Sequence, residues 1–125
     1  MSKRKIIKFK DWECSVHFRT YGNGRTAIEL LIAEDDPKNE CFKGEPVLVA
    51  TVNCPEFPLG TNQVLIKNWS ENEGILKVLI DEKIVKYLNY DHPMGYPRAN
   101  LCELLPRIVN YTKDDEKNYF LKVNL

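Results

Sequence analysis

The sequence predicts an α+β protein in which an antiparallel sheet of about five to six strands packs on one main helix, over about residues 71–82. Three observations predict this class. Apolar residues between positions 75 and 80 follow helical spacing, whereas residues 12–18 alternate as a strand does. The strand-like stretches before the helix follow one another at hairpin-length spacing, which favours antiparallel pairing.

The first clear strand spans residues 12–18, where apolar and polar side chains alternate without exception. A second strand follows over residues 26–33, again with its apolar residues on one side. Residues 5–9 either add a strand of their own or lengthen the first one across Lys10 and Asp11. Each of the two clear strands therefore has one face that suits a core.

The glycine-rich turn between these strands sets how they pair. A three-residue loop, Gly22 to Gly24, places Phe18 opposite Ile28, so that the apolar faces coincide. A two-residue Asn-Gly turn would place Phe18 opposite Glu29 and mix the two faces. We therefore predict the three-residue loop, with Gly24 in the left-handed conformation.

The segment over residues 35–46 is polar and rich in turn formers, so we expect an exposed loop there. A strand over residues 47–54 follows, and it ends at that point because Pro55 cannot donate to a ladder. A short strand over residues 63–67 then leads into the helix.

Ser70 and Glu73 predict where the helix begins. Their Ser-x-x-Glu spacing is that of a capping box, in which each side chain accepts the backbone N–H of the other residue. Gly74 is unusual, because glycine inside a helix costs about 1 kcal/mol relative to alanine. We expect the Trp69 indole to lie over the bare backbone at Gly74.

The helix has one apolar arc and one charged face at helical spacing. The apolar arc consists of Ile75, Leu76, Val78, Leu79 and Ile80. Glu82 would fall back into that arc, so the helix ends near Asp81 or Glu82. Asn72 also projects into the arc, so we expect its amide to bond to the turn over residues 53–58 or to line a small polar pocket.

Beyond the helix, residues 84–89 suit a strand, residues 90–97 a loop rich in tyrosine and proline, and residues 98–104 another strand. The tail is less regular. A helix cap at Thr112 is one alternative, but the strand period at its end favours a strand within residues 106–125.

The chain has 125 residues, of which 43% are hydrophobic and 29% charged, an ordinary globular composition. We expect one domain over residues 1–125, with its core over about 12–105 and a C-terminal extension over 106–125. The zero formal charge argues against a general attraction to nucleic acid or anionic membranes. Without a membrane-length apolar run or a signal peptide, the expected location is the cytoplasm.

The four cysteines are widely scattered and form no C-x-x-C pair: Cys14, Cys41, Cys54 and Cys102. Three of them lie in apolar or strand-like stretches, so we expect free thiols rather than disulfides. Their spacing matches neither a zinc site nor a redox pair, so no metal and no cofactor is expected.

Two phrases carry a resemblance: T-V-N-C-P-E-F-P-L over residues 51–59 and I-K-N-W-S-E-N-E-G over residues 66–74. They resemble the T-V-N-x-P-x-x-P-L and I-K-x-x-S-E-N-E-G pattern of an uncharacterised bacterial family, a domain of unknown function found in phages and conjugative elements of gut bacteria. A later cysteine of that pattern corresponds to Cys102. The resemblance covers roughly residues 12–104. It implies an accessory role in transfer or host interaction, with no activity to carry over.

The densest group of side chains typical of a binding site lies over residues 90–98: Tyr90, Asp91, His92, Tyr96 and Arg98. Prolines at positions 93 and 97 would stiffen the loop that holds them. Aromatic and arginine side chains on a rigid loop suit recognition of a protein partner. The alternative is that the tyrosines fold back over the edge of the core.

His17 and Glu29 become cross-strand neighbours in the expected register, with Arg19 diagonal to Glu29. A His–Glu pair can move protons near neutral pH, but no nucleophile or metal-spaced partner accompanies it. A surface ion pair is the better interpretation. A small hydrolase that uses His17 or His92 is an alternative, and it requires a carboxylate or thiol within hydrogen-bond reach of either ring.

Leu31 makes the outer face of the first hairpin more apolar than a bare surface needs. That face suits either the C-terminal strand or a second copy of the chain, so a homodimer is one alternative.

These patterns predict a non-enzymatic accessory protein that binds another protein, through residues 90–98 or through the outer face of the hairpin. Nucleic-acid binding is a second hypothesis, which the zero net charge argues against. It would use Tyr21, Arg25 and the basic start of the chain: Lys3, Arg4, Lys5, Lys8 and Lys10.

Overall fold

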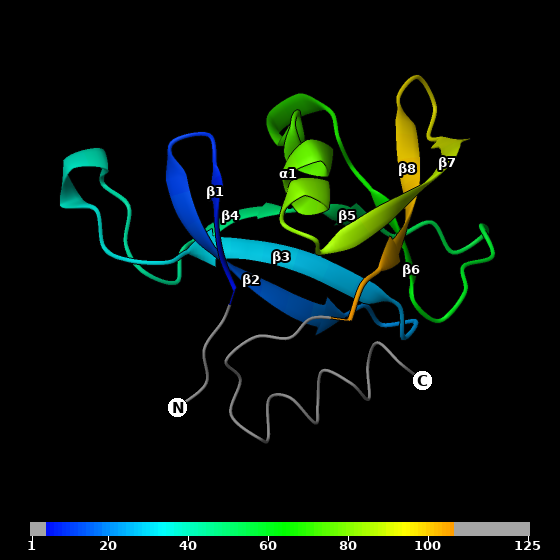
Figure 1. The fold of residues 1–125 in the computed structure, drawn as a ribbon, viewed down its shortest axis with the longest axis horizontal. Helices are drawn as coiled ribbons and strands as arrows, with labels where there is room; N and C mark the ends of the chain where they lie inside the picture. The colour runs from blue at the N-terminus through cyan, green and yellow to red at the C-terminus, as the bar shows by residue number, and fades with distance from the viewer. Residues whose placement is uncertain (1–4, 107–125) are drawn as a thin grey trace.

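The computed structural model of the protein describes residues 5–106 and has an α+β fold (Figure 1). Its strands form two antiparallel sheets of four strands each. The first sheet has the order β1 (Ile6–Phe9), β2 (Trp12–Thr20), β3 (Thr26–Ile32), β4 (Pro46–Val49). The second has the order β5 (Thr51–Val52), β6 (Gln63–Ile66), β8 (Arg98–Leu104), β7 (Val85–Pro93). The predicted α+β class is confirmed, but the prediction of a single sheet is wrong.

The described residues also contain three short helical segments: η1 (Pro37–Asn39), η2 (Ser70–Asn72) and α1 (Ile75–Asp81). The first two are 3₁₀ turns, and α1 is the α-helix. None of the helices within residues 5–106 has the length and apolar character needed to cross a membrane.

The register of the first hairpin is the predicted one. Phe18 pairs with Ile28, and the strands close through a hydrogen bond from the Tyr21 N–H to the Arg25 carbonyl at 2.7 Å. Gly24 has φ 87°, the left-handed conformation that the three-residue loop requires. β1 is a separate strand, because Lys10 turns the chain with φ 56°.

The chain passes from the first sheet to the second at Ala50. The Ala50 N–H donates to the Ile28 carbonyl of β3 at 2.8 Å, while the Ala50 carbonyl accepts from the Lys67 N–H, just after β6, at 2.8 Å. The single strand predicted over residues 47–54 is therefore split between two sheets. Ala50 is fully buried at this crossing, and its two backbone hydrogen bonds join the ladders of both sheets.

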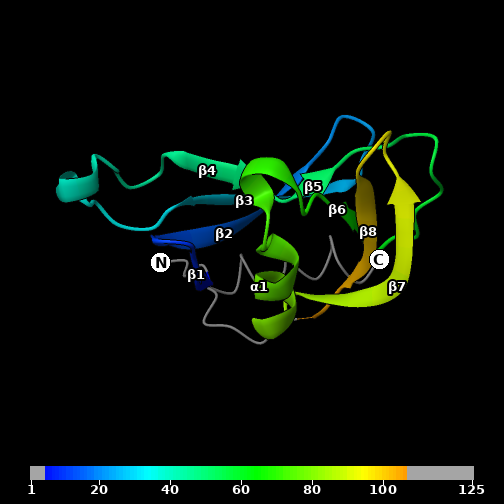
Figure 2. The same cartoon turned by 90° about the horizontal axis from the view of Figure 1, so that it is seen from above.

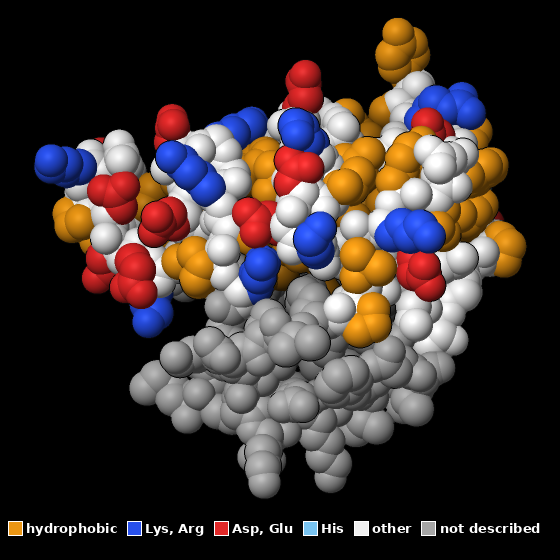
Figure 3. All heavy atoms as spheres, viewed as in Figure 1, with side chains coloured by type: hydrophobic (Ala, Val, Ile, Leu, Met, Phe, Trp, Pro, Cys, Tyr) orange, Lys and Arg blue, Asp and Glu red, His pale blue; other side chains and the backbone are white. Residues whose placement is uncertain are grey.

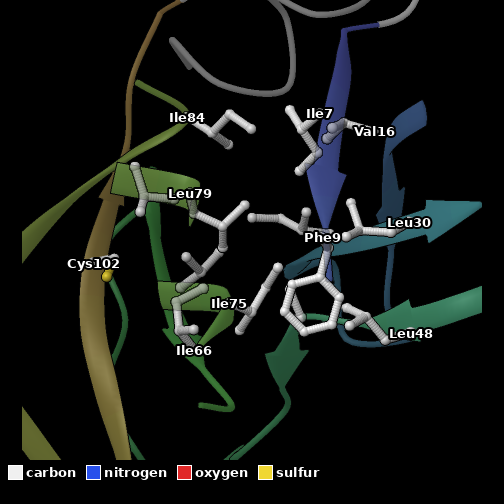
Figure 4. Packing of buried hydrophobic residues seen from close by; sticks show 14 of the residues in the cluster. Ile7, Phe9, Val16, Leu30, Leu48, Ile66, Ile75, Leu79, Ile84 and Cys102 are labelled. Carbon is white, nitrogen blue, oxygen red and sulfur yellow. The ribbon is translucent and has the colours of Figure 1, made fainter. Parts of the chain in front are cut away.

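Both sheets share one hydrophobic core with α1, which packs against β1 and β7 (Figure 2). Ile75 and Leu79 of α1 are fully buried and point toward Phe9 and Leu30 of the first sheet (Figure 4). The buried face predicted for the helix is confirmed at these two positions. It is wrong at Ile80, which is 37% exposed.

The predicted helix start at Ser70 is wrong. Ser70 has φ 60° and lies in a 3₁₀ turn, and α1 begins only at Ile75, so Ser70 and Glu73 form no capping box. Gly74 has φ 98° and interrupts the helical path. The Asn68 side-chain oxygen replaces the expected cap, because it accepts the N–H groups of Gly74 at 3.1 Å and Leu76 at 2.9 Å.

A Cβ built at Gly74 would meet no other atom within 4 Å, so the Trp69 indole does not fill the space that a side chain at this position would take. The reason for glycine there is its left-handed backbone, not a close neighbour. Asn72 is fully buried, as its place in the apolar arc predicts, but its Nδ2 donates to the Val49 carbonyl of β4 at 2.8 Å rather than to residues 53–58.

α1 ends at Asp81, as predicted. Lys83 adopts φ 59° and its N–H donates to the Ile80 carbonyl at 3.0 Å, while the Ile84 N–H donates to the Leu79 carbonyl at 2.9 Å. This pair of bonds is a Schellman motif, with Lys83 at the position that glycine usually occupies.

The loop predicted over residues 90–97 is wrong in its first half. β7 continues to Pro93, with a bulge between Tyr87 and Asp91 where Asn89 has φ 60°. The turn itself is shorter and closes with a hydrogen bond from the Met94 N–H to the Pro97 carbonyl at 2.8 Å. The predicted strand within residues 106–125 falls on positions 107–125, outside the described residues.

Candidate functional site

A groove of about 540 Å³ lies beside the start of β8. We call it the β8 groove, and it is lined by Asn68, Trp69, Tyr96, Pro97, Arg98 and Asn100. Two of the predicted partner-binding residues, Tyr96 and Arg98, therefore lie in one surface depression. On the face shown in Figure 3, hydrophobic side chains gather over β7 and β8 with basic side chains beside them.

The groove presents exposed aromatic and cationic groups. Tyr96 lies in the turn before β8, and its side chain is fully exposed. Arg98 is also exposed, and its Nη2 donates to the Asp91 carbonyl at 3.4 Å. Within residues 5–106, Arg98 forms no ion pair with a carboxylate.

A polar network fixes the strands beside the groove. The Tyr87 hydroxyl donates to Asp91 Oδ1 at 2.6 Å, and the Asn100 Nδ2 donates to the same oxygen at 2.8 Å. These bonds, that of Tyr87 first, hold the pKa of the Asp91 carboxyl below its ordinary value. The same carboxylate raises the pKa of Tyr87. Because Tyr87 and Asp91 lie on either side of the bulge, the network stabilises this irregular part of β7.

Tyr90 and His92 lie away from the β8 groove, because side chains alternate along β7 and Asp91 points to the groove side. Phe57 covers both of them, with its ring centroid 5.8 Å from that of Tyr90 and 4.5 Å from that of His92. The five residues predicted as a group over residues 90–98 are therefore divided between two faces of the second sheet.

His92 also contacts a thiol that the sequence did not indicate. Cys54 Sγ lies 3.7 Å from His92 Nε2 and 3.5 Å from Glu56 Oε1. The backbone N–H of Glu56, and then the Cys54 thiol, hold the pKa of that carboxyl below its ordinary value. A thiol is thus within reach of a histidine, as the hydrolase alternative requires.

The other ring nitrogen opposes that chemistry. His92 Nδ1 is buried and has no hydrogen-bond partner among the described residues. To accept the Cys54 proton at Nε2, the ring must carry its own hydrogen on Nδ1, and a buried N–H without an acceptor costs about 1–3 kcal/mol. The contact among Cys54, Glu56 and His92 is better explained as a link between β7 and the segment after β5.

Arg25 holds the same segment in place. Its Nη1 donates to the Cys54 carbonyl and its Nη2 to the Phe57 carbonyl, both at 2.6 Å. The Tyr21 hydroxyl lies 2.9 Å from Thr51 Oγ1. Both auxiliaries of the nucleic-acid hypothesis, Tyr21 and Arg25, therefore bond within the fold.

The predicted cross-strand pairing of His17 with Glu29 is confirmed. Glu29 accepts from Arg19 Nε at 2.9 Å, and the His17 Nε2 lies 2.8 Å from Ser15 Oγ. Leu31 follows on the same outer face of β3 and is partly buried. An exposed ion pair of this kind contributes about 0–1 kcal/mol.

Two of the basic residues near the start of the described chain make separate contacts within the fold. Lys5 Nζ lies 3.4 Å from Glu82 Oε1, and Lys10 Nζ donates to the Glu71 carbonyl at 3.2 Å. Lys3 and Arg4 lie outside the described residues. Lys5 thus contacts the residue after α1, Lys10 contacts η2, and Lys8 lies beside the turn between β1 and β2, so these three lysines point to different parts of the molecule.

All four cysteines are free. Burial raises the pKa of Cys14 to about 11, and burial together with the Asp91 charge raises that of Cys102 to about 12. Over residues 5–106, no three histidine, cysteine, aspartate or glutamate side chains are placed to hold a metal ion.

Comparison with family models, curated proteins and solved structures finds no match to this chain. The resemblance to the mobile-element family therefore stays a prediction.

Proposed function

We propose that this chain binds another protein, without catalysis, and that the β8 groove is the binding surface. The observation that carries the proposal is the placement of exposed Tyr96 beside Trp69 and Pro97, next to Arg98, which forms no ion pair within residues 5–106. Tryptophan, tyrosine and arginine are enriched among the few residues that dominate the binding energy of protein interfaces.

The polar groups of the groove indicate the chemistry of the partner. Arg98 Nε and Nη1 and Asn68 Nδ2 have no partner within residues 5–106, so they are donors available to a ligand. The amide oxygens of the groove are already used or buried: Asn68 Oδ1 caps α1, and Asn100 Oδ1 is buried. A groove that offers donors and a positive charge suits a peptide that carries a carboxylate next to an apolar side chain.

The groove is also held in one shape. Asn68 is fixed by its two bonds to the start of α1, and Asn100 by its bond to Asp91. A preorganised surface loses less conformational entropy when a partner binds. This property supports recognition of a specific segment.

The two alternatives have less support. Nucleic-acid binding would need Tyr21, Arg25 and the basic start of the chain, yet Tyr21, Arg25, Lys5 and Lys10 make contacts within the fold. The hydrolase would need His92 to accept a proton, which its unpartnered Nδ1 opposes. A cytoplasmic location and a role in a mobile element complete the proposal, and they rest on the sequence alone.

A capture experiment with the full chain tests the groove. The double variant Tyr96→Ser with Arg98→Gln should lose partners that the unmodified chain captures from host lysate. The control, Ile80→Ser with Lys77→Gln, changes another exposed apolar residue and a nearby cation on α1, and should keep them. An unchanged partner list in the Tyr96 and Arg98 variant would exclude the β8 groove.

A further inference from the structure

A second depression lies at the edge of the first sheet where β3 ends, away from the second sheet. The chain leaves β3 there as a projecting segment, residues 34–45, which we call the arm (Figure 1). Two cavities of about 330 and 340 Å³ lie between the arm and the turn that joins β1 to β2. Both are lined by Trp12, Ile32 and Cys41, so they are two parts of one feature, the Trp12 groove.

One part of this groove is apolar. Pro46 and Val47 of β4 join Trp12 and Ile32 in its lining, and Glu45 adds one carboxylate there. Trp12 is only partly buried against the core and contributes to both cavities. Cavities of about 300–1,000 Å³ with an aromatic lining are of the size that ligand groups occupy.

The other part is strongly acidic. Its lining includes five carboxylates and one lysine: Asp11, Glu13, Glu34, Asp35, Asp36 and Lys8. None of these side chains forms an ion pair within the described part of the chain. Acidic side chains also gather at this end of the molecule in Figure 3.

The carboxylates that are hydrogen-bonded accept from neutral donors. Asp35 Oδ1 accepts the Lys43 backbone N–H at 2.8 Å, and Asp36 Oδ2 accepts from the Asn39 amide at 2.7 Å. These bonds hold the arm in shape without cancelling its charge. The negative charge of the groove is therefore left for a ligand to neutralise.

We propose that the Trp12 groove binds a basic segment of a partner protein, with a lysine or arginine side chain between the indole and the carboxylates. The face of a tryptophan attracts an ammonium or guanidinium group, and the carboxylates add charge complementarity. The site is separate from the β8 groove, which presents a cation and donors. A bare metal ion fits less well, because no three of the described donors converge on one point.

Calorimetric titration of the full chain with synthetic peptides tests this directly. The probe is acetyl-Gly-Lys-Lys-Lys-Gly-amide, and the matched control replaces each lysine by uncharged norleucine. The lysine peptide should bind at least roughly tenfold more tightly than the control, and more weakly as salt rises. Equal binding of the two peptides, or no binding of the lysine peptide below about 1 mM, would overturn the proposal.

Variants locate the binding. Glu13→Gln with Glu34→Gln changes two exposed carboxylates of the groove and should weaken the lysine peptide roughly fivefold or more. Glu73→Gln with Glu103→Gln makes the same change of charge elsewhere and should leave binding unchanged. An equal loss of affinity in both variants would mean that the net charge of the protein, and not the Trp12 groove, determines peptide binding, and would contradict the proposal.

Two further variants separate this inference from the proposed function. Trp12→Leu should weaken the lysine peptide, whereas Tyr96→Ser with Arg98→Gln should leave it unchanged. If the β8 groove variant alone lost the lysine peptide, the Trp12 groove would be the wrong site.

Discussion

The side-chain oxygen of Asn68 lies 2.9 Å from the backbone nitrogen of Leu76 and accepts its hydrogen. The same residue lines the β8 groove. One asparagine thus caps α1 with its oxygen and offers its amide N–H to the groove. Its two roles can be separated by mutation.

Asn68→Ala should destabilise the protein by about 1–2 kcal/mol, because two N–H groups at the start of α1 lose their acceptor. Asn68→Asp should keep nearly full stability, because a carboxylate oxygen can take the same place. It should nevertheless bind an acidic partner more weakly, since it replaces a donor with a negative charge. Urea unfolding together with partner capture would measure both effects, and equal instability of the two variants would contradict this account of the cap.

Lys83→Gly should stabilise the protein by about 0.5–1 kcal/mol. Lys83 holds φ 59° at the end of α1, a conformation that costs an L residue energy and glycine almost none. Lys77→Gly is the control, since it places glycine inside α1 and should destabilise by about 1 kcal/mol. Thermal unfolding of both variants gives the comparison, and a loss of stability in Lys83→Gly would refute the Schellman assignment.

The Tyr87 and Asp91 pair should make stability depend on pH at both extremes. The pKa of Asp91 is lowered in the fold, so its contribution is present above the unfolded value and is lost as pH falls through the folded value. The pKa of Tyr87 is raised, so its contribution is present below the unfolded value and is lost as pH rises through the folded value.

Tyr87→Phe keeps the ring and removes the hydroxyl, so it should flatten both limbs of the stability profile. The measurement is the free energy of unfolding from acid to alkaline pH in the two proteins. Parallel profiles would show that this pair does not set the dependence.

The cysteines should fall into two reactivity classes. Cys14 and Cys102 are buried and their pKa values are raised to about 11 and about 12, so alkylation should reach them only after unfolding. Cys41 and Cys54 are partly exposed and should react in the native protein. Mass spectrometry after brief iodoacetamide treatment distinguishes the classes, and early labelling of Cys102 would contradict the packing of the core.

The parts of the fold that local pattern controls could be predicted. The Gly22 to Gly24 turn follows from strict alternation on both sides of it, because a loop one residue shorter or longer would place apolar residues opposite polar ones. The end of α1 follows from the loss of helical period at Glu82.

Other features depend on contacts between distant residues. Nothing local at Ala50 indicates that its N–H and carbonyl pair with different sheets. The Ser70 and Glu73 spacing matched a capping box, yet the left-handed Gly74 and the more distant Asn68 acceptor gave the helix another start. Tertiary hydrogen bonds prevailed over a local motif there.

The candidate sites divide in the same way. Tyr96 and Arg98 were predicted because composition and prolines mark a turn. Tyr90 and His92 were assigned to that loop because the bulge at Asn89, which lets β7 continue, has no clear sequence signal. The Trp12 groove was missed, because it exists only where the arm folds back beside the β1 and β2 turn.

The crossing at Ala50 also determines how the molecule responds to force. No flexible tether separates its halves, since the main chain of one buried alanine belongs to both ladders. Tension on either half is transmitted rigidly to the other. Fluorescent labels on β2 and β7 should keep a constant separation as force increases, until both sheets unfold together in one step.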